Sequence, residues 1–469
     1  MRKLYIAALT SSAILLFGLG KTDASKDARL KGAFRRAETN GWIQVHLQGP
    51  PAQIGFQHGY LLAPEIKEAS KILKLELTRD SKKDWMFFRN AAQEVLWPRI
   101  DPEYREELQG IADGVKAHGV DLDVVDITVM NAWLELAPYY TTWYDKNNQK
   151  KPQGATSPGE RCSAFVATGS YTHDGKPVMG HNAWTNYMDG ARWNIIFDIV
   201  PQSGNAIVMD GFPGLIHSAD DFGVNSAGIM ITETTLSEFS GFDPKGVPEF
   251  VRARKAMQYS NSIDDFERIM KDGNNGGYAN TWLVADRKTD EIASLELGLK
   301  NVTLQRSNDG YFSGSNYPAN PKLIEEETEF TSADLSVSAN ARRVRWDQLM
   351  AENKGHIDVE AGKRFLADHY DSFEKKLQPG ERSLCGHIDL SPRGLLHWQP
   401  AYGVAGAVQA KVMDSAMAGR MSIWAAMGHP CGTHFKAAAH LKSHPEFAWQ
   451  KELLKDLNSR PWTVFAAAK

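Results

Sequence analysis

The spacing of apolar residues changes once along this 469-residue chain, and the change limits the possible folds more than any other feature. From residue 51 to about residue 133, apolar side chains recur every three or four residues, which is typical of amphipathic helices. After residue 163 the spacing becomes two, which is typical of strands. Helices grouped before a run of strands predict a layered α+β fold in which helices cover a sheet.

The second half of the chain predicts an antiparallel meander. The turn His-Asp-Gly-Lys at residues 173–176 predicts a hairpin between a strand at residues 164–167 and a strand that starts at about residue 177. Further strands are predicted at residues 193–200, 206–209, 223–225, 228–232, 281–285 and 292–297. A helix from about residue 248 to about residue 270 interrupts them.

The first 24 residues have the layout of a signal peptide. Arg2 and Lys3 precede an apolar run that ends near Gly20, and Ala24 supplies a small residue at the expected cut. A retained membrane anchor is the alternative, but the run is short for a bilayer span and no stop-transfer pattern follows. We therefore expect the mature chain in the periplasm, outside the cell or in a lumen, with no stable membrane span.

Composition narrows the class of partner. A net charge of −4 with no basic patch gives no reason to expect nucleic acid, and 42% hydrophobic residues supply a core. Thirteen tryptophans are consistent with apolar clefts and equally with ordinary packing. We expect a small-molecule partner.

A polar segment, residues 144–159, separates the two halves and predicts an exposed mobile loop that stops just before Cys162. The chain has three cysteines, and an odd number in an exported protein leaves one thiol without an intramolecular partner. A bond between Cys385 and Cys431 would leave Cys162 free, and the sequence leaves that pairing open.

A free thiol at the junction of a loop and a strand can act as a nucleophile at a new N-terminus. If the bond between Arg161 and Cys162 is cut, the α-amino group of Cys162, with a pKa of about 7.7–8.0, can take the proton of its own thiol. The same thiol can make the cut by attacking the carbonyl of Arg161. A small buried structural cysteine is the alternative.

Three polar residues are candidates to assist this thiol. His181 and Asn182 lie on the predicted partner strand of the Cys162 strand, where they could approach the sulfur. Asn280 begins a strand after a glycine-rich stretch and could donate to a developing oxyanion. A satisfied turn histidine and a turn asparagine are the alternatives.

The ordered motifs resemble those of the phospholipase B-like (lamina ancestor) family. They are CSAF at 162–165, GHNAW at 180–184, SADDF at 218–222, TETT at 232–235, YANTWLVAD at 278–286, SNYP at 315–318, QAKV at 409–412 and FAW at 447–449. The stretch at residues 54–63 is similar to a helix of the related acyl-coenzyme A:6-aminopenicillanic acid acyltransferases. The resemblance covers most of the mature chain.

This resemblance implies a four-layer αββα sandwich of the N-terminal-nucleophile hydrolases and self-cleavage before Cys162. It implies that Cys162 is the nucleophile, Asn280 the oxyanion donor, and His181 and Trp184 pocket residues. Bile-salt-hydrolase relatives have Arg and Asp where His181 and Trp184 stand, which disfavours bile-salt-like specificity. Arg342 is the candidate for a distal arginine of those relatives, with a solvated helix face as the alternative.

Cleavage would divide the mature chain into two segments of one domain. Residues 25–161 form the mostly helical first segment, which ends in the exposed loop. Residues 162–469 form the catalytic segment. We expect a self-cleaving hydrolase of acyl ester or amide bonds in lipid-like substrates, with no cofactor. An acyltransferase, an N-acyl amidase or a non-catalytic secreted lipid- or sugar-binding protein are the alternatives.

Two other enzyme classes fit less well. A serine hydrolase would need Gly-x-Ser-x-Gly, and the nearest run, residues 223–228, has one residue too many. His429, His434, His440 and His444 are spaced by five, six and four residues, which matches no standard zinc pattern. We therefore expect these histidines on the surface and no metal.

Overall fold

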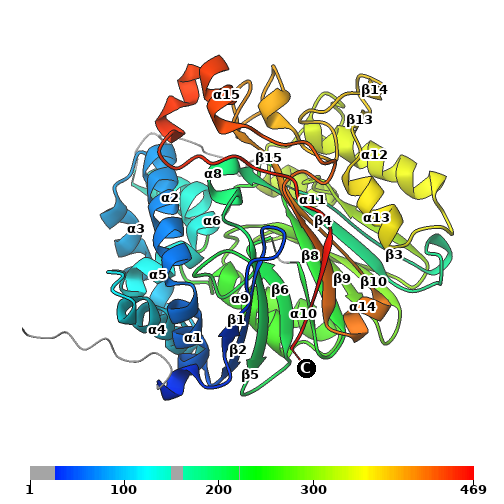
Figure 1. Cartoon of the computed structure of the whole chain (residues 1–469). Helices are drawn as coiled ribbons and strands as arrows, with labels where there is room; N and C mark the ends of the chain where they lie inside the picture. The colour runs from blue at the N-terminus through cyan, green and yellow to red at the C-terminus, as the bar shows by residue number, and fades with distance from the viewer. Residues whose placement is uncertain (1–26, 149–161, 221, 469) are drawn as a thin grey trace, which may run out of the picture.

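The computed structural model describes residues 27–148, 162–220 and 222–468 (Figure 1). The predicted signal peptide, most of the predicted loop and Arg161 lie outside the described residues. In the described part, helices dominate before residue 149 and two large sheets follow, so the predicted α+β class is confirmed. None of the helices in these ranges is both long enough and apolar enough to cross a bilayer.

The predicted helical region folds as five main helices: α1 (Pro51–Leu61), α2 (Ala63–Ser81), α3 (Trp85–Ala91), α4 (Pro102–Ala117) and α5 (Val124–Asn131). Helices α1 and α4 pack closely because glycines face each other. A Cβ at Gly55 would lie 1.9 Å from the Glu107 carbonyl oxygen, and one at Gly114 would lie 2.4 Å from that of Phe56. Two short helices follow, α6 (Trp133–Glu135) and α7 (Thr141–Asn147), so the predicted loop is helical up to Asn147.

The larger sheet has nine strands in the order β1-β2-β5-β6-β7-β8-β9-β10-β11. Their bounds are β1 (Phe34–Arg35), β2 (Ile43–Gly49), β5 (Ile195–Pro201), β6 (Ile207–Gly211), β7 (Gly223–Asn225), β8 (Ile229–Thr235), β9 (Asn280–Asp286), β10 (Glu291–Leu297) and β11 (Val302–Ser307). All neighbours are antiparallel except β2 and β5. This sheet therefore joins strands from before and after the predicted loop.

The single helix predicted near residues 248–270 is two helices, α9 (Glu249–Tyr259) and α10 (Ile263–Lys271). The prediction was wrong at Ser262, which has extended backbone and accepts a hydrogen bond from the Asp265 backbone N–H at 3.1 Å. A serine in that position starts a new helix.

The smaller sheet has six strands in the order β12-β3-β4-β15-β16-β17. They are β12 (Gly310–Gly314), β3 (Ser163–Thr168), β4 (Val178–Asn186), β15 (Ala405–Asp414), β16 (Ser422–Met427) and β17 (Thr463–Ala466). The predicted hairpin is confirmed, since β3 and β4 are antiparallel with Ser163 opposite Asn182. The remaining elements are α8 (Tyr187–Gly190), α11 (Pro321–Glu327), α12 (Ser338–Glu352), α13 (Val359–Leu366), β13 (Tyr370–Asp371), β14 (Lys376–Leu377), α14 (Ser415–Gly419) and α15 (Ala437–Ser443).

Alternating side chains on β3 show how the two sheets are packed. Ala164 and Val166 belong to an apolar cluster with residues of the larger sheet, such as Val208, whereas Phe165 packs with residues of α12 and α13. The opposite face of the larger sheet packs against α1, α2, α4 and α5. Figure 1 shows these helices, in blue and cyan, on the side opposite α12 and α13, in yellow. Cys162, which precedes β3, thus lies at the boundary between the sheets.

Candidate active site

Cys162 is held in an unusual backbone conformation at the start of β3. Its φ is +74°, a left-handed value that a non-glycine residue rarely adopts, and only 3% of the residue is exposed. Burial and the nearby Glu233 carboxylate raise the pKa of the Cys162 thiol, and the Trp184 backbone N–H opposes them. The thiol therefore needs a base before it can act as a nucleophile.

Arg342 of α12 binds the main chain of Cys162. Its Nη1 donates to the Cys162 carbonyl oxygen at 2.5 Å and to Ser163 Oγ at 3.1 Å, and its Nη2 donates to Asn316 Oδ1 at 2.9 Å. The guanidinium lies 4.4 Å from the centre of the Trp184 ring. Because Arg342 is 0% exposed, the alternative of a solvated helix face is wrong.

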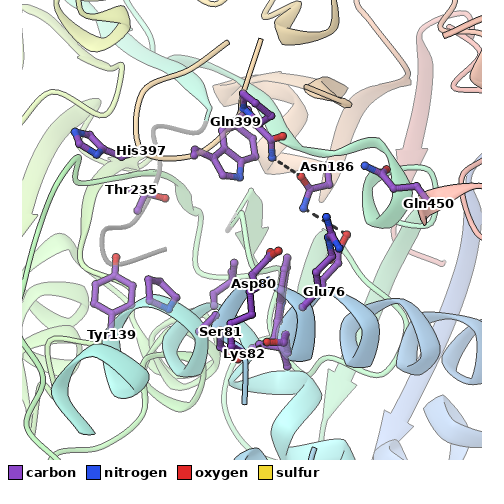
Figure 2. A pocket seen from close by; sticks show the side chains of 18 of the residues that line it. Glu76, Asp80, Ser81, Lys82, Tyr139, Asn186, Thr235, His397, Gln399 and Gln450 are labelled. Carbon is purple, nitrogen blue, oxygen red and sulfur yellow. Dashed lines mark hydrogen bonds between the residues drawn. The ribbon is translucent and has the colours of Figure 1, made fainter. Parts of the chain in front are cut away.

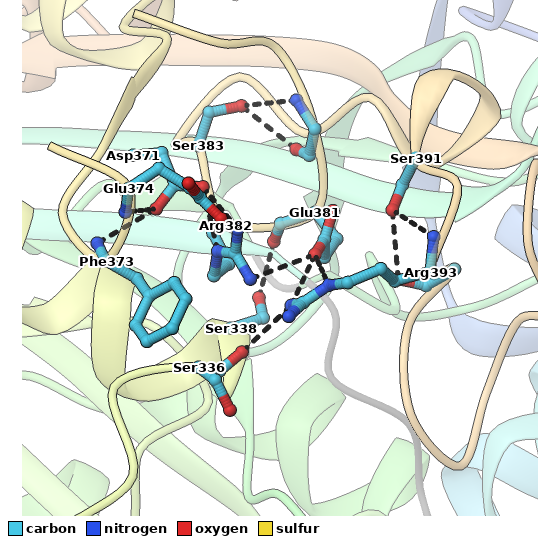
Figure 3. A network of polar contacts seen from close by, with 12 residues as sticks. Ser336, Ser338, Asp371, Phe373, Glu374, Glu381, Arg382, Ser383, Ser391 and Arg393 are labelled. Atoms are coloured by element: carbon cyan, nitrogen blue, oxygen red, sulfur yellow. Dashed lines mark hydrogen bonds and ion pairs between the residues drawn. The ribbon is translucent and has the colours of Figure 1, made fainter. Parts of the chain in front are cut away.

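A polar network outside the sheets also holds the Nε atom of Arg342. Arg342 Nε donates to Ser338 Oγ at 2.9 Å, and the same hydroxyl donates to the Glu381 carbonyl oxygen at 2.6 Å. Figure 3 shows Glu381 between Arg382 and Arg393, and Arg393 Nη2 lies 2.7 Å from Glu381 Oε1. The segment around residues 371–393 therefore anchors the arginine that holds Cys162.

Asn280 is connected to Cys162 through a chain of contacts. Asn316, which accepts from Arg342, donates to the Thr235 carbonyl oxygen at 2.8 Å, and Thr235 is paired with Asn280 in the larger sheet. Asn280 is buried, and neither polar atom of its side chain has a hydrogen-bond partner within the described part of the chain. A buried amide of this kind is costly unless a ligand or water satisfies it.

His181 and Asn182 point to opposite faces of the smaller sheet. His181 lies between the sheets, 3.8 Å from Asp220, and neither ring nitrogen has a hydrogen-bond partner among the described residues. Asn182 instead donates to the carbonyl oxygens of Leu366 at 2.7 Å and Leu384 at 2.9 Å. This placement corrects the expectation that Asn182 approaches the sulfur, because neighbouring strand residues face opposite sides.

Burial and the charge of Lys411 lower the pKa of His181 to about 3. The imidazole is therefore neutral near pH 7 and does not act as a cation toward Cys162. It is a neutral, buried polar group between the sheets.

A buried ionic cluster beside His181 was not predicted. Lys411 Nζ lies 3.1 Å from Asp210 and 2.5 Å from Asp220, and Ser218 Oγ lies within hydrogen-bond distance of both carboxyl groups, at 2.8 Å and 2.9 Å. Burial and Asp220 raise the pKa of Asp210, while Lys411 overcomes burial and lowers that of Asp220. The cluster therefore carries one positive charge, on Lys411, and one negative charge, on Asp220, which balance each other. Ser218, Asp220 and Lys411 lie in motifs that carry the family resemblance, whereas Asp210 does not, and no pattern in the sequence indicated that these residues form a cluster.

Trp184 packs against two other parts of this region. Its ring lies 4.4 Å from the Arg342 guanidinium, and a Cβ added to Gly386 would lie 2.4 Å from ring atoms. The ring is buried, and its expected role as a pocket residue stays a prediction.

A cavity with a mostly apolar lining lies near Asn280. It has a volume of about 340 Å³ and reaches Thr235, the sheet partner of Asn280, and Tyr278, two residues before it. The apolar lining comes from four separate segments: Leu77, Trp133, Leu134, Ala137, Pro138, Tyr139, Trp398, Phe447 and Trp449. None of the predicted site residues lines it among the described residues, and three of its members are tryptophans.

Polar groups form one wall of this cavity. Figure 2 shows Gln399 donating to Asn186, at 2.7 Å, and Asn186 reaching Glu76, with Tyr139, Thr235 and His397 on another side. Tyr278 also lines the cavity and donates to Glu233 Oε1 at 3.0 Å. The cavity thus combines an apolar lining with a few ordered polar groups, as ligand sites do.

Side chains arranged to hold a metal ion lie outside this site. In the described ranges they are His369, Cys385, His387 and Cys431, with a second set of His387, Asp389 and His429. The prediction that the C-terminal histidines are surface residues is wrong for His429, which is 2% exposed and stacks on His387.

Comparisons with known proteins agree on one family. The phospholipase B profile matches residues 69–460. An uncharacterised protein of Archaeoglobus fulgidus is 24% identical over 361 residues, or 70% of this chain and 58% of that protein. Phospholipase-B 81 of Drysdalia coronoides is 25% identical over 455 residues, or 84% of this chain and 77% of that protein.

Phospholipase B-like protein C of Dictyostelium discoideum is 24% identical over 203 residues, or 39% of this chain and 35% of that protein. The match therefore covers less than two thirds of the Archaeoglobus and Dictyostelium proteins. Because the family profile extends over most of the sequence, the chain belongs to the phospholipase B family.

Proposed function

We propose that this chain is a self-cleaving cysteine hydrolase of the N-terminal-nucleophile class, with an αββα arrangement, that cuts acyl ester or amide bonds of lipid-like substrates. Membership of the phospholipase B family supports the reaction class. The observation that carries the proposal is the geometry of Cys162: a buried thiol at the start of β3, with strained backbone and its carbonyl oxygen bound by a buried arginine.

Self-cleavage would begin with attack of the Cys162 sulfur on the carbonyl carbon of Arg161. The sulfur–carbon bond forms and the peptide C–N bond breaks, and the departing nitrogen of Cys162 takes the thiol proton. Water then hydrolyses the thioester and leaves a free amine on Cys162. The left-handed backbone of an unbranched non-glycine residue costs about 1 kcal/mol or more, and cutting the preceding bond would relieve it.

The mature enzyme would use one residue as base and nucleophile. The free amine of Cys162, with a pKa of about 7.7–8.0, takes the thiol proton, and the sulfur attacks the acyl carbonyl. Asn280 Nδ2 donates to the oxyanion that develops there. The leaving alcohol or amine receives the proton, and water activated by the same amine releases the acid from the acyl-thioester.

Arg342 would position the nucleophile rather than react. Its hydrogen bond to the Cys162 carbonyl oxygen holds the main chain of Cys162 and leaves the amine and the sulfur free to react. The apolar cavity beside Asn280 suits an acyl chain, and the polar wall suits a head group. An N-acyl amide fits the same geometry, and transfer of the acyl group to an amine is the second possible outcome of the thioester.

The test combines protein chemistry with product analysis. Purified protein and the variants Cys162→Ala and Cys162→Ser would be compared by intact mass, N-terminal sequencing and release of fatty acid from a phospholipid and from an N-acyl amide. We expect a new N-terminus at Cys162 in the natural protein, and an uncut, inactive chain in Cys162→Ala. An uncut natural protein, or undiminished hydrolysis by Cys162→Ala, would refute the proposal.

A further inference from the structure

Four metal-binding side chains from distant parts of the sequence meet outside the active site. His369 follows α13, Cys385 and His387 lie in the segment before β15, and Cys431 follows β16. The ligand atoms of all four lie within 4.8 Å of one another. We propose that they bind one Zn²⁺ ion in a closed, structural site.

The distances between the ligand atoms fit a tetrahedral zinc ion. His387 Nε2 lies 3.2 Å from His369 Nε2, 3.4 Å from Cys385 Sγ and 3.5 Å from Cys431 Sγ. With Zn–N of about 2.0–2.1 Å and Zn–S of about 2.3 Å, a tetrahedron requires N···N of about 3.3–3.4 Å and S···N of about 3.5–3.6 Å. The three spacings around His387 Nε2 agree with these values to within about 0.2 Å.

Hydrogen bonding alone does not account for this arrangement. A single nitrogen, His387 Nε2, faces one nitrogen and two sulfur atoms at nearly equal distances. One ring nitrogen either donates one hydrogen or offers one lone pair, so it can satisfy one of these neighbours. A cation between the four groups satisfies all of them together.

The ligand set also indicates which metal and which role. Two cysteines and two histidines are a standard tetrahedral zinc set, and four protein ligands leave no open position for substrate. Cys385 and His387 are buried, whereas His369 and Cys431 are partly exposed, so an ion can enter from solvent. The site is therefore structural and not catalytic.

A carboxylate and a second imidazole lie close to His387. Its Nδ1 is 4.0 Å from Asp389 Oδ1, which is too far for a hydrogen bond, and Asp389 accepts one from the Tyr187 hydroxyl at 2.7 Å. His429 covers the other face of the ring, with centroids 4.1 Å apart.

A disulfide between Cys385 and Cys431, left open by the sequence, is the competing state of these two residues. Both are free thiols in the structure. A disulfide would use neither imidazole, so the convergence of His369 and His387 on the sulfur atoms would have no function. The four-group geometry therefore favours the metal.

The site would brace the catalytic region through one residue. Gly386, between two of the ligands, packs against the ring of Trp184, which contacts Arg342. An ion that holds Cys385 and His387 would therefore also hold Gly386, the residue against which the Trp184 ring packs. Metal removal would then loosen Arg342 and Cys162 without removing any reacting group.

Metal analysis tests the inference. Untagged protein purified without added metal or chelator would be measured by elemental mass spectrometry, and exchanged with Co²⁺ for visible absorption. We expect one zinc per chain, loss of at least nine tenths of it in Cys431→Ser and in His369→Ala, and a tetrahedral thiolate spectrum with Co²⁺. His434→Ala, an exposed histidine whose ring accepts from the Ser459 backbone N–H, is the matched control and should keep its zinc.

A measurement on the natural protein guards against variants that do not fold. Zinc-bound thiols should resist iodoacetamide at Cys385 and Cys431 until a chelator is added, and chelation should lower the melting temperature reversibly on return of Zn²⁺. A Cys385–Cys431 linked peptide in an unreduced digest with less than a tenth of a zinc per chain would overturn the inference. Full zinc content in Cys431→Ser would do so too. These readouts do not depend on cleavage before Cys162.

Discussion

The two polar regions that adjoin Cys162 differ in how their hydrogen bonds are used. On the helix side of the smaller sheet, Arg342 donates to Cys162, Ser163, Asn316 and Ser338. Nearer the larger sheet, the side chains of Asn280 and His181 have no hydrogen-bond partner among the described residues. The first region holds the main chain of Cys162 in place. The second contains buried polar side chains whose hydrogen-bonding capacity is unused within the described residues.

The largest expected effect comes from removing Arg342, which makes the hydrogen bonds of the first region. Arg342→Met removes every donor to the Cys162 carbonyl oxygen described above and leaves buried acceptors unpaired. Hydrogen bonds from charged donors contribute about 1.5–3 kcal/mol each, so we expect the free energy of unfolding to fall by about 3–5 kcal/mol and cleavage before Cys162 to stop.

Urea unfolding at pH 7 and N-terminal sequencing measure these two effects. Arg343→Met is the matched control, because Arg343 is partly exposed, lies 3.6 Å from Asp347 on the same helix and packs over the Tyr317 ring. Such ion pairs contribute less than about 1 kcal/mol. Equal stability of the two variants would contradict the assigned role of Arg342.

Removing the Asn280 side chain tests the second region, whose polar groups have no hydrogen-bond partner among the described residues. Asn280→Ala deletes a buried amide that makes no hydrogen bond to the described protein, so the free energy of unfolding should fall by no more than about 1 kcal/mol. If Asn280 donates to the oxyanion, kcat should fall by about 10²–10³-fold. Steady-state kinetics on the cleaved variant measure this, and an unchanged kcat would remove Asn280 from the mechanism.

Asn182 resembles the first region, because its side chain makes hydrogen bonds to the protein, although it is next to His181 in sequence. Asn182→Ala leaves the Leu366 and Leu384 carbonyl oxygens without their donor, so we expect a loss of about 1–3 kcal/mol in the free energy of unfolding. The kcat of the folded variant should stay within about twofold of the natural protein. A loss of kcat with unchanged stability would place Asn182 in the reaction after all.

The smallest effect at neutral pH is expected at His181. The folded protein holds His181 neutral down to pH about 3, while the unfolded chain takes up a proton below its ordinary value of 6.5. This group therefore contributes stability above pH 6.5 that is lost as the pH falls toward 3, at about 1.4 kcal/mol per pH unit.

His181→Leu should change the free energy of unfolding at pH 7 by less than about 1.5 kcal/mol and remove that acid-side slope. Urea unfolding from pH 4 to pH 7 measures the difference between the two proteins. Parallel curves would show that His181 titrates normally in the folded state.

The layering of the fold could be predicted because it depends on side-chain period. The helical spacing before residue 133 and the strand spacing after residue 163 identify the two kinds of layer, and the Asp-Gly turn at residues 174–175 gives the β3–β4 hairpin. The same period predicts that His181 and Asn182 face opposite ways, so the error at Asn182 was avoidable.

Other parts of the site depend on long-range packing and left no local signal. Arg342 lies in an arginine-rich helix that looks solvated in sequence, and only the fold shows that it is buried. The cavity draws its lining from segments near residues 77, 134, 398 and 449, which no local motif connects. The zinc ligands are similarly scattered, and the histidine spacings considered in the sequence did not include His369 or His387.

The parallel pairing of β2 with β5 determines what kind of molecule a cut before Cys162 would leave. Seven main-chain positions of β2, from Ile43 to Gly49, are in register with β5, across the proposed cut. The two products would form a permanent heterodimer. It would behave as a single species in solution, and its chains would separate only when the sheet is unfolded. Reassembly would then be a concentration-dependent encounter between two chains, so denaturation of the mature protein would be far harder to reverse than that of its precursor.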